Sequence, residues 1–228
     1  PSEGEIWLDD IRITDLSSAE RAARPQTRSV TEKPLAESDS SVDGVFLGWF
    51  TEGIHAGKEK LDAVSLRIGR KPAMAMWYVD WGAGFPGKEC EAMRQSGMVP
   101  HVTWEPWLWN NHNAINLQDI ASGRRDAYIR DFARGAKEWG HPFFLRVAHE
   151  MNGDWYPWCV ATNGKDAQLY VKAWRRMHDL FLKEKCTNAI WVWCPNNLSQ
   201  PNEPWNDPLL TYPGDAYVDV VSGTTYDD

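Results

Sequence analysis

One segment combines a carboxylic acid with several flat aromatic side chains. The segment 146–158, RVAHEMNGDWYPW, begins as an apolar strand and continues with His149 and Glu150, followed by Trp155 and Trp158. Cleavage of a glycosidic bond requires a carboxylic acid that protonates the leaving oxygen. Indole rings offer an apolar face with a polar edge, which suits the half-apolar surface of a sugar ring. The residue types and their order therefore predict that Glu150 is a general acid/base beside a sugar-binding surface.

Further polar and aromatic side chains stand just past the ends of other predicted strands: Trp81, Glu105, Trp107, Asn196 and Tyr226. Glu105 supplies a second carboxylate, which would permit an inverting mechanism if acid and base stand roughly 6.5–9.5 Å apart. We favour the other interpretation, in which Glu105 binds a sugar hydroxyl or tunes its neighbours.

Three other charged or titratable residues are less informative. Arg146 lies inside a strand two residues before the predicted cleft, and we expect it to pair with a buried carboxylate. Asp80 and His101 fit a structural role as well as a functional one, and a single histidine at the start of a strand is more often structural.

Short apolar runs alternate with helical patterns after position 43, which predicts a parallel α/β fold. Predicted strands cover 44–50, 73–78, 99–104, 142–148, 189–194 and 218–223, and predicted helices cover 58–68, 86–96, 124–139 and 165–183. A doubly wound sheet and a (β/α)8 barrel both have this alternation of strands and helices. The first strand is not followed by a GxGxxG motif, and polar side chains gather past the strands' carboxyl ends. We therefore predict a (β/α)8 TIM barrel, incomplete, with about six βα units.

The first 42 residues have a different character. Residues 5–13, EIWLDDIRI, alternate like one half-buried strand, and the stretch that follows is rich in Ser, Arg, Pro and Thr without periodicity. We predict that 1–15 closes a preceding module, that 16–42 is a linker, and that 43–228 is the partial catalytic domain.

Composition narrows the classes of function. The net charge is -8 and basic residues are not clustered, which argues against a nucleic-acid partner. No apolar stretch is long enough to span a membrane. The 14 tryptophans among 228 residues favour a carbohydrate partner. The four cysteines, Cys90, Cys159, Cys186 and Cys194, lack the spacing of a metal site, and their disulfide state stays open. Neither a metal nor an organic cofactor is expected.

The motif HEMNGDWYPW resembles the acid/base motif of glycoside hydrolase family 26, a family of retaining (β/α)8-barrel endo-β-glycanases. HVTWEPW at 101–107, WVWCPNN at 191–197 and YPGDAYVDVVSGTTY at 212–226 are also similar to this family. The resemblance covers roughly residues 44–228, in the order in which the family has these motifs.

The resemblance implies a role for each matching residue. Glu150 would be the acid/base and His149 its hydrogen-bonding neighbour, and Tyr226 would contact the nucleophile. Trp155 and Trp158 would be platforms for sugar rings. The family's nucleophile is a glutamate on the seventh strand, so we expect it beyond residue 228. The segment 5–13 is similar to the closing strand of a jelly-roll carbohydrate-binding module.

The sequence thus predicts a retaining endo-β-glycanase whose partner is a polysaccharide, most plausibly mixed-linkage β-1,3-1,4-glucan. β-1,4-Mannan is the close alternative and β-1,3-xylan a distant third. A polysaccharide-binding protein without catalysis is the alternative from another class. We expect a secreted monomer with an appended carbohydrate-binding module.

Overall fold

The structure of the chain, a computed structural model, describes residues 46–56 and 58–225. The predicted end of a preceding module at 1–15, the predicted linker at 16–42 and Tyr226 all lie outside the described residues. None of the described helices is both long and apolar enough to cross a membrane.

The centre of the fold is a sheet of six strands, each parallel to the next and arranged in the order of the chain. The strands are β1 (Gly48–Phe50), β2 (Met74–Asp80), β3 (Val99–Glu105), β4 (Phe143–Val147), β5 (Ala189–Trp193) and β6 (Val220–Val221). A doubly wound sheet would reverse its strand order at a switch point, whereas a barrel wall keeps it. The prediction of an incomplete (β/α)8 barrel is confirmed.

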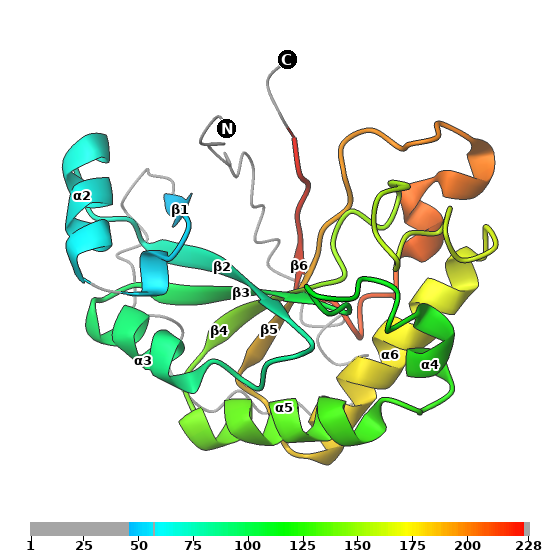
Figure 1. Cartoon of the computed structure of the whole chain (residues 1–228), viewed down its shortest axis with the longest axis horizontal. Coiled ribbons are helices and arrows are strands. Elements are labelled where there is room, and N and C mark those ends of the chain that lie inside the picture. The colour runs from blue at the N-terminus through cyan, green and yellow to red at the C-terminus, as the bar shows by residue number, and fades with distance from the viewer. Residues whose placement is uncertain (1–45, 57, 226–228) are drawn as a thin grey trace, which may run out of the picture.

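Helices cover the outside of this curled sheet (Figure 1). The four predicted helices are present as α2 (Lys58–Ile68), α3 (Gly87–Gln95), α5 (Asp126–Trp139) and α6 (Ala167–Lys183). The sequence did not predict α4 (Leu117–Ala121) or the 3-10 turns η1 (Ile54–Ala56), η2 (Pro204–Asn206) and η3 (Pro208–Thr211). These elements are too short to show a helical period in the sequence.

Local sequence explains the two long helices. In α5 the buried residues Ile129, Phe132, Ala133 and Ala136 recur at helical spacing and form one apolar stripe. The helix ends at Gly140, whose φ of 80° is the left-handed conformation that glycine adopts without strain. At the start of α6 the Asp166 carboxylate accepts the backbone N–H groups of residues 168 and 169, which caps the helix.

The core lies between the sheet and these helices and is rich in aromatic rings. Trp104 of β3 stacks on Phe132 of α5, with 4.3 Å between ring centroids, and Phe181 of α6 meets Trp191 of β5 edge-on. Because side chains alternate along a strand, the neighbours of Trp104, which are Thr103 and Glu105, point away from the helices. The outer packing therefore determines which side chains of each strand face the barrel interior.

The last strand is shorter than predicted. The sequence predicts a strand over 218–223, but β6 covers only Val220–Val221. Just before it, the carboxylate of Asp219 accepts the backbone N–H of Trp191 at 2.8 Å. A side chain thus takes the place of a backbone carbonyl, and regular pairing begins one residue later.

Candidate active site

The backbone turns sharply where β4 ends. Ala148 and Glu150 both have positive φ, 43° and 54°, a conformation that is strained for residues other than glycine. Hydrogen bonds from both neighbouring strands hold this turn. The N–H of Ala148 donates to the carbonyl of Trp104 at 3.2 Å, and the N–H of Glu150 donates to the carbonyl of Cys194 at 2.7 Å. Such strain is typical of functional sites, where surrounding contacts maintain it.

Glu150 is buried, at 6% exposure of the whole residue, and its carboxyl group has an indole beside it. The Nε1–H of Trp155 donates to Oε2 of Glu150 at 3.1 Å. Gly153 makes this contact possible, because a Cβ at position 153 would lie 2.5 Å from the ring of Trp155. The indole therefore lies close against bare backbone, and its edge fixes one oxygen of the acid.

His149 is buried among aromatic rings beside Glu150. Its ring centroid lies 5.0 Å from that of Tyr156 and 5.9 Å from those of Tyr78 and Trp158. Burial holds the pKa of His149 well below its usual value, and the positive charge of Arg146 lowers it further. The imidazole is therefore neutral at neutral pH.

The second predicted carboxylate, Glu105, ends the neighbouring strand β3 and is 3% exposed. Burial raises the pKa of Glu105 to about 7, although hydrogen bonds from Trp107 and Trp109 oppose the shift. Those two indole N–H groups both donate to Oε2, at 3.0 and 3.5 Å. Near neutral pH this carboxyl group therefore exists in both protonation states.

Asn196 lies past the end of β5 and is tied to the loop that follows Glu150. Its backbone N–H donates to Oδ1 of Asn152, and Nδ2 of Asn152 donates back to its carbonyl, at 2.8 and 2.9 Å. Asn206 also holds Asn152, through a 2.7 Å bond from its Nδ2 to the carbonyl. Three adjacent strands, β3, β4 and β5, thus carry Glu105, Glu150 and Asn196 at the same edge of the sheet.

The predicted tryptophans divide into exposed and buried ones. Trp155 is 43% exposed, and Trp107 is partly buried. Trp158 is 1% exposed and stacks on Tyr156 at 4.3 Å, and its Nε1 donates to the carbonyl of His149. Trp81 is 4% exposed and stacks on Trp104 within the core. Neither Trp158 nor Trp81 presents a face to solvent. In this structure both pack in the core beside the site.

Arg146 does not have the carboxylate partner that the sequence predicts. Its Nε donates to Oγ1 of Thr103 at 3.0 Å, and its Nη1 lies 3.7 Å from Sγ of Cys194. Its Nη2 has no hydrogen-bond partner within the described part of the chain. No ion pair of Arg146 is found among residues 46–56 and 58–225. Thr103 is the register partner of Arg146 on β3, which brings the two side chains together inside the barrel.

Sequence reasoning missed Tyr78 and Trp109. Tyr78 contacts His149 and also the guanidinium of Arg146, 5.9 Å from its ring. Burial raises the pKa of Tyr78, although the guanidinium of Arg146 opposes the shift. Alternation along β2 would have placed Tyr78 on the same face as Asp80, which is the signal that could have found it.

The four cysteines are all buried and all free, which resolves the open question of a disulfide. Cys194 lies inside the barrel next to Arg146 and 3.5 Å from Oγ1 of Thr224. Cys159 donates to the carbonyl of Glu150 at 3.4 Å. These thiols act here as small packing groups around the turn.

A groove of about 400 Å³ adjoins the site on the side of Trp155. Its walls combine aromatic rings with amide side chains, and they include Trp107, His112, Asn116, Trp155, Tyr156 and Asn163. Trp155 both lines this groove and donates to Glu150, so the groove begins one residue away from the acid.

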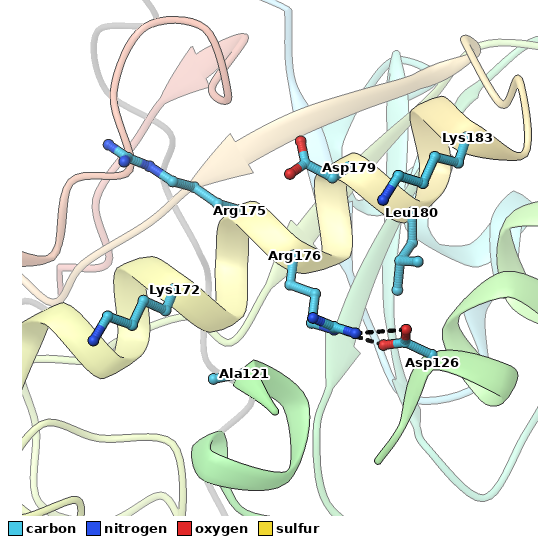
Figure 2. A pocket seen from close by; sticks show the side chains of 8 residues that line it. All are labelled: Ala121, Asp126, Lys172, Arg175, Arg176, Asp179, Leu180 and Lys183. Atoms are coloured by element: carbon cyan, nitrogen blue, oxygen red, sulfur yellow. Dashed lines mark hydrogen bonds and ion pairs between the residues drawn. The ribbon is translucent and has the colours of Figure 1, made fainter. Parts of the chain in front are cut away.

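A second depression lies on the outer helices, away from the strand ends (Figure 2). Arg176 and Asp126 form a two-bonded ion pair there, with both distances 2.7 Å. The lining residues are Ala121, Asp126, Lys172, Arg175, Arg176, Asp179, Leu180 and Lys183. This lining has charged side chains but no aromatic ring, so it does not suit a sugar.

The fold and the site together define a class: a (β/α)8-type barrel with carboxylates and a buried histidine at the carboxyl ends of its strands. Residues 116–228 match the family model of Glycosyl hydrolase family 26. This match assigns residues 116–228 to that family.

Curated relatives agree with this assignment. The chain is 34% identical to Endoglucanase H of Acetivibrio thermocellus over 158 residues, which are 68% of the chain and 17% of that protein. It is 32% identical to a mannan endo-1,4-beta-mannosidase of Bacillus subtilis strain 168 over 123 residues, which are 49% of the chain and 32% of that protein. The chain thus spans less than a third of the length of these two relatives.

Solved structures share the fold. The mannanase man26 of Bacillus subtilis superposes with a TM-score of 0.59 at 21% identity, over 77% of this chain and 61% of that one. A beta-mannanase from a symbiotic protist of the termite Reticulitermes speratus, complexed with gluco-manno-oligosaccharide, superposes with a TM-score of 0.57 at 20% identity, over 78% and 63%.

Proposed function

We propose that this chain supplies the acid/base residue of a retaining endo-β-glycanase, and that this residue is Glu150. The observation that carries the proposal is the setting of Glu150: a buried residue on a strained strand end, with one carboxyl oxygen held by the indole of Trp155. A structural glutamate would have no need of a strained backbone and a half-exposed aromatic partner.

The two carboxyl oxygens of Glu150 have different roles in this proposal. Trp155 donates to Oε2, which leaves Oε1 to exchange a proton with the substrate in this proposal. In the first step the protonated acid donates its proton to the leaving glycosidic oxygen while a second carboxylate attacks the anomeric carbon. In the second step the ionised Glu150 takes a proton from the water that displaces this carboxylate. By resemblance to the family, we propose a glutamate on a seventh strand of the barrel as that nucleophile.

The substrate we propose is mixed-linkage β-1,3-1,4-glucan. Endoglucanase H aligns with a larger part of the chain than the mannosidase of Bacillus subtilis, at similar identity. β-1,4-Mannan is the second candidate, because four curated relatives are mannosidases. Hydrolysis of each polysaccharide by the intact protein, followed through released reducing ends, decides between them.

We also propose that the protein acts outside the cell, because polysaccharides of this kind are too large to pass a membrane. A non-catalytic polysaccharide-binding protein is the rival from another class. A glutamate in contact with an indole would serve binding as well, so a test has to separate turnover from affinity.

The test is replacement of Glu150 in the intact protein by alanine and by glutamine. Without the acid, hydrolysis of unactivated polysaccharide should fall by about 10²–10⁴-fold or more. A dinitrophenyl glycoside, whose leaving group needs little protonation, should keep most of its first-step rate. Equal losses on both substrates would show that Glu150 is not the acid. A Glu150→Gln protein that binds oligosaccharide unchanged, from a parent that never turned it over, would support the binding protein.

A further inference from the structure

Two carboxylates at adjacent strand ends hold the loop that follows β3. Asp80 and Glu105 are register partners at the ends of β2 and β3. Oε2 of Glu105 accepts the indole N–H groups of both Trp107 and Trp109. Oδ2 of Asp80 accepts the backbone N–H of Trp109 at 2.9 Å. Trp109 is therefore held at its backbone and at its ring.

Backbone bonds tighten the same loop. The N–H of Trp81 donates to the carbonyl of Trp107 at 2.9 Å, which ties the loop to the residue after β2. A bridge between Leu108 and Asn111 closes the turn that carries Trp109. An indole at the centre of so many contacts would normally be buried.

Trp109 is instead 60% exposed. A large apolar ring that is fixed at one edge and open to solvent over its surface gains little from packing, so the contacts are not explained by core formation. They are explained if the ring face must be kept in one place for a ligand. The matching ligand has a flat apolar face with a polar rim, which describes a sugar ring.

The loop is continuous with the site around Glu150. The ring of Trp107 meets those of Tyr156 and Trp158 edge-on at 5.4 and 5.3 Å, and both of these rings contact His149. A chain bound at Glu150 and extending along this edge of the sheet would therefore come upon Trp109.

We propose that Trp109 is a specificity-determining platform for a sugar unit distant from the cleaved bond, and that Glu105 and Asp80 are the positioning residues that hold it. This inference rests on the proposed function. Glu105 is then neither a second catalytic carboxylate nor a direct ligand of the reacting sugar.

The experiment measures dissociation constants by calorimetry in the intact protein carrying Glu150→Gln. The probes are β-1,3-1,4-gluco-oligosaccharides of three and six sugars. Trp109→Ala should weaken binding of the longer probe about 3- to 10-fold, the range of an aromatic contact, and leave the shorter probe unchanged. Leu66→Ala, which removes an exposed side chain from the outer helix α2, is the control and should change neither value.

Positioning is tested by Glu105→Ala, alone and combined with Trp109→Ala. If Glu105 acts through Trp109, the two losses should not add, because the second change removes a ring that is already free. Trp109→Phe, which keeps a ring but loses the N–H, should fall between the parent and Trp109→Ala. Additive losses, or a Trp109→Ala protein that binds the longer probe as its parent does, would overturn the inference.

A kinetic arm separates this inference from the proposed function. In the protein with Glu150 intact, Glu105→Ala should raise KM for polysaccharide and leave kcat within about threefold. A collapse of kcat at unchanged KM would make Glu105 a catalytic carboxylate and overturn the positioning role. Full activity in Glu150→Ala would overturn the proposed function alone, since the binding measurements do not depend on turnover.

Discussion

At the scale of single residues, the site depends on a glycine that has no chemistry of its own. Gly153 leaves the space in which the ring of Trp155 lies, and Trp155 in turn donates to Glu150. The placement of the acid is therefore set by three residues within one short loop. A hydrogen bond to a charged group contributes about 1.5–3 kcal/mol, which is enough to select one orientation of a carboxyl group.

We predict that Gly153→Ala displaces the indole and lowers kcat on polysaccharide by about 10- to 100-fold, the loss of one charge-assisted hydrogen bond. Trp155→Phe, which keeps a ring but removes the N–H, should lower kcat similarly. Steady-state kinetics measures both. If Gly153→Ala alone is active at the level of the parent, the indole has moved without consequence for Glu150.

At the scale of elements, helix α6 supports the strained turn from behind. The hydroxyl of Tyr170 donates to the carbonyl of Ala148 at 3.1 Å, and Tyr170 is fully enclosed in the core. The carbonyl belongs to the first of the two residues with positive φ. A helix that packs on the sheet thus also helps to maintain the conformation that presents Glu150.

We predict that Tyr170→Phe lowers the free energy of unfolding by about 1–3 kcal/mol, because the buried carbonyl loses its partner. Activity should fall as well, since the turn is released. Tyr128→Phe is the control, because its hydroxyl donates to the carbonyl of Ala83 and accepts from Nε1 of Trp104 but bonds to neither Ala148 nor Glu150. Denaturant unfolding and kinetics on both variants test this. Unchanged activity in Tyr170→Phe would mean that the strands alone hold the turn.

At the scale of the whole molecule, the barrel interior contains titratable groups whose charges are disfavoured by burial. Burial raises the pKa of Glu105 to about 7 and lowers the pKa of His101 to about 3. The pKa of His149 also lies well below its usual value. Folding therefore favours the neutral form of each of these groups, and stability must depend on pH.

We predict a specific effect for Glu105. Its folded pKa of about 7 exceeds the ordinary value of 4.5, so the folded protein keeps a proton that the unfolded chain releases between these pH values. The free energy of unfolding should therefore fall as pH rises from 4.5 to 7, by up to about 3 kcal/mol from this group. Hydrogen bonds from Trp107 and Trp109 and the charge of Arg146 oppose the shift, and the charge of Asp80 adds to it.

Unfolding by urea across this pH range, compared between the parent and Glu105→Gln, isolates the effect, because the amide does not titrate. The difference between the two proteins should change across pH 4.5–7 and level off above it. A difference that is constant with pH would show that Glu105 titrates normally in the folded protein.

Sequence by itself determined the features that depend on local order along the chain. Periodicity, and the points where a periodic pattern stops, predict the apolar stripe of α5, its end at a glycine and the positions of the strands. They also predict that Glu105, Glu150 and Asn196 lie at strand ends. Parallel strands then bring such ends to one edge of the sheet, because each crossover returns the chain to the same side.

Only the tertiary structure decided which aromatic rings are open to solvent and what the polar groups contact. Trp81 and Trp158 are buried while Trp109 is exposed, although all three are tryptophans in segments that follow a strand. Arg146 meets a hydroxyl and a thiol where a carboxylate was expected. Burial and pairing depend on what the neighbouring strands and helices bring to the same place, and those neighbours are distant in sequence. The order of residues along a short segment therefore does not specify these contacts.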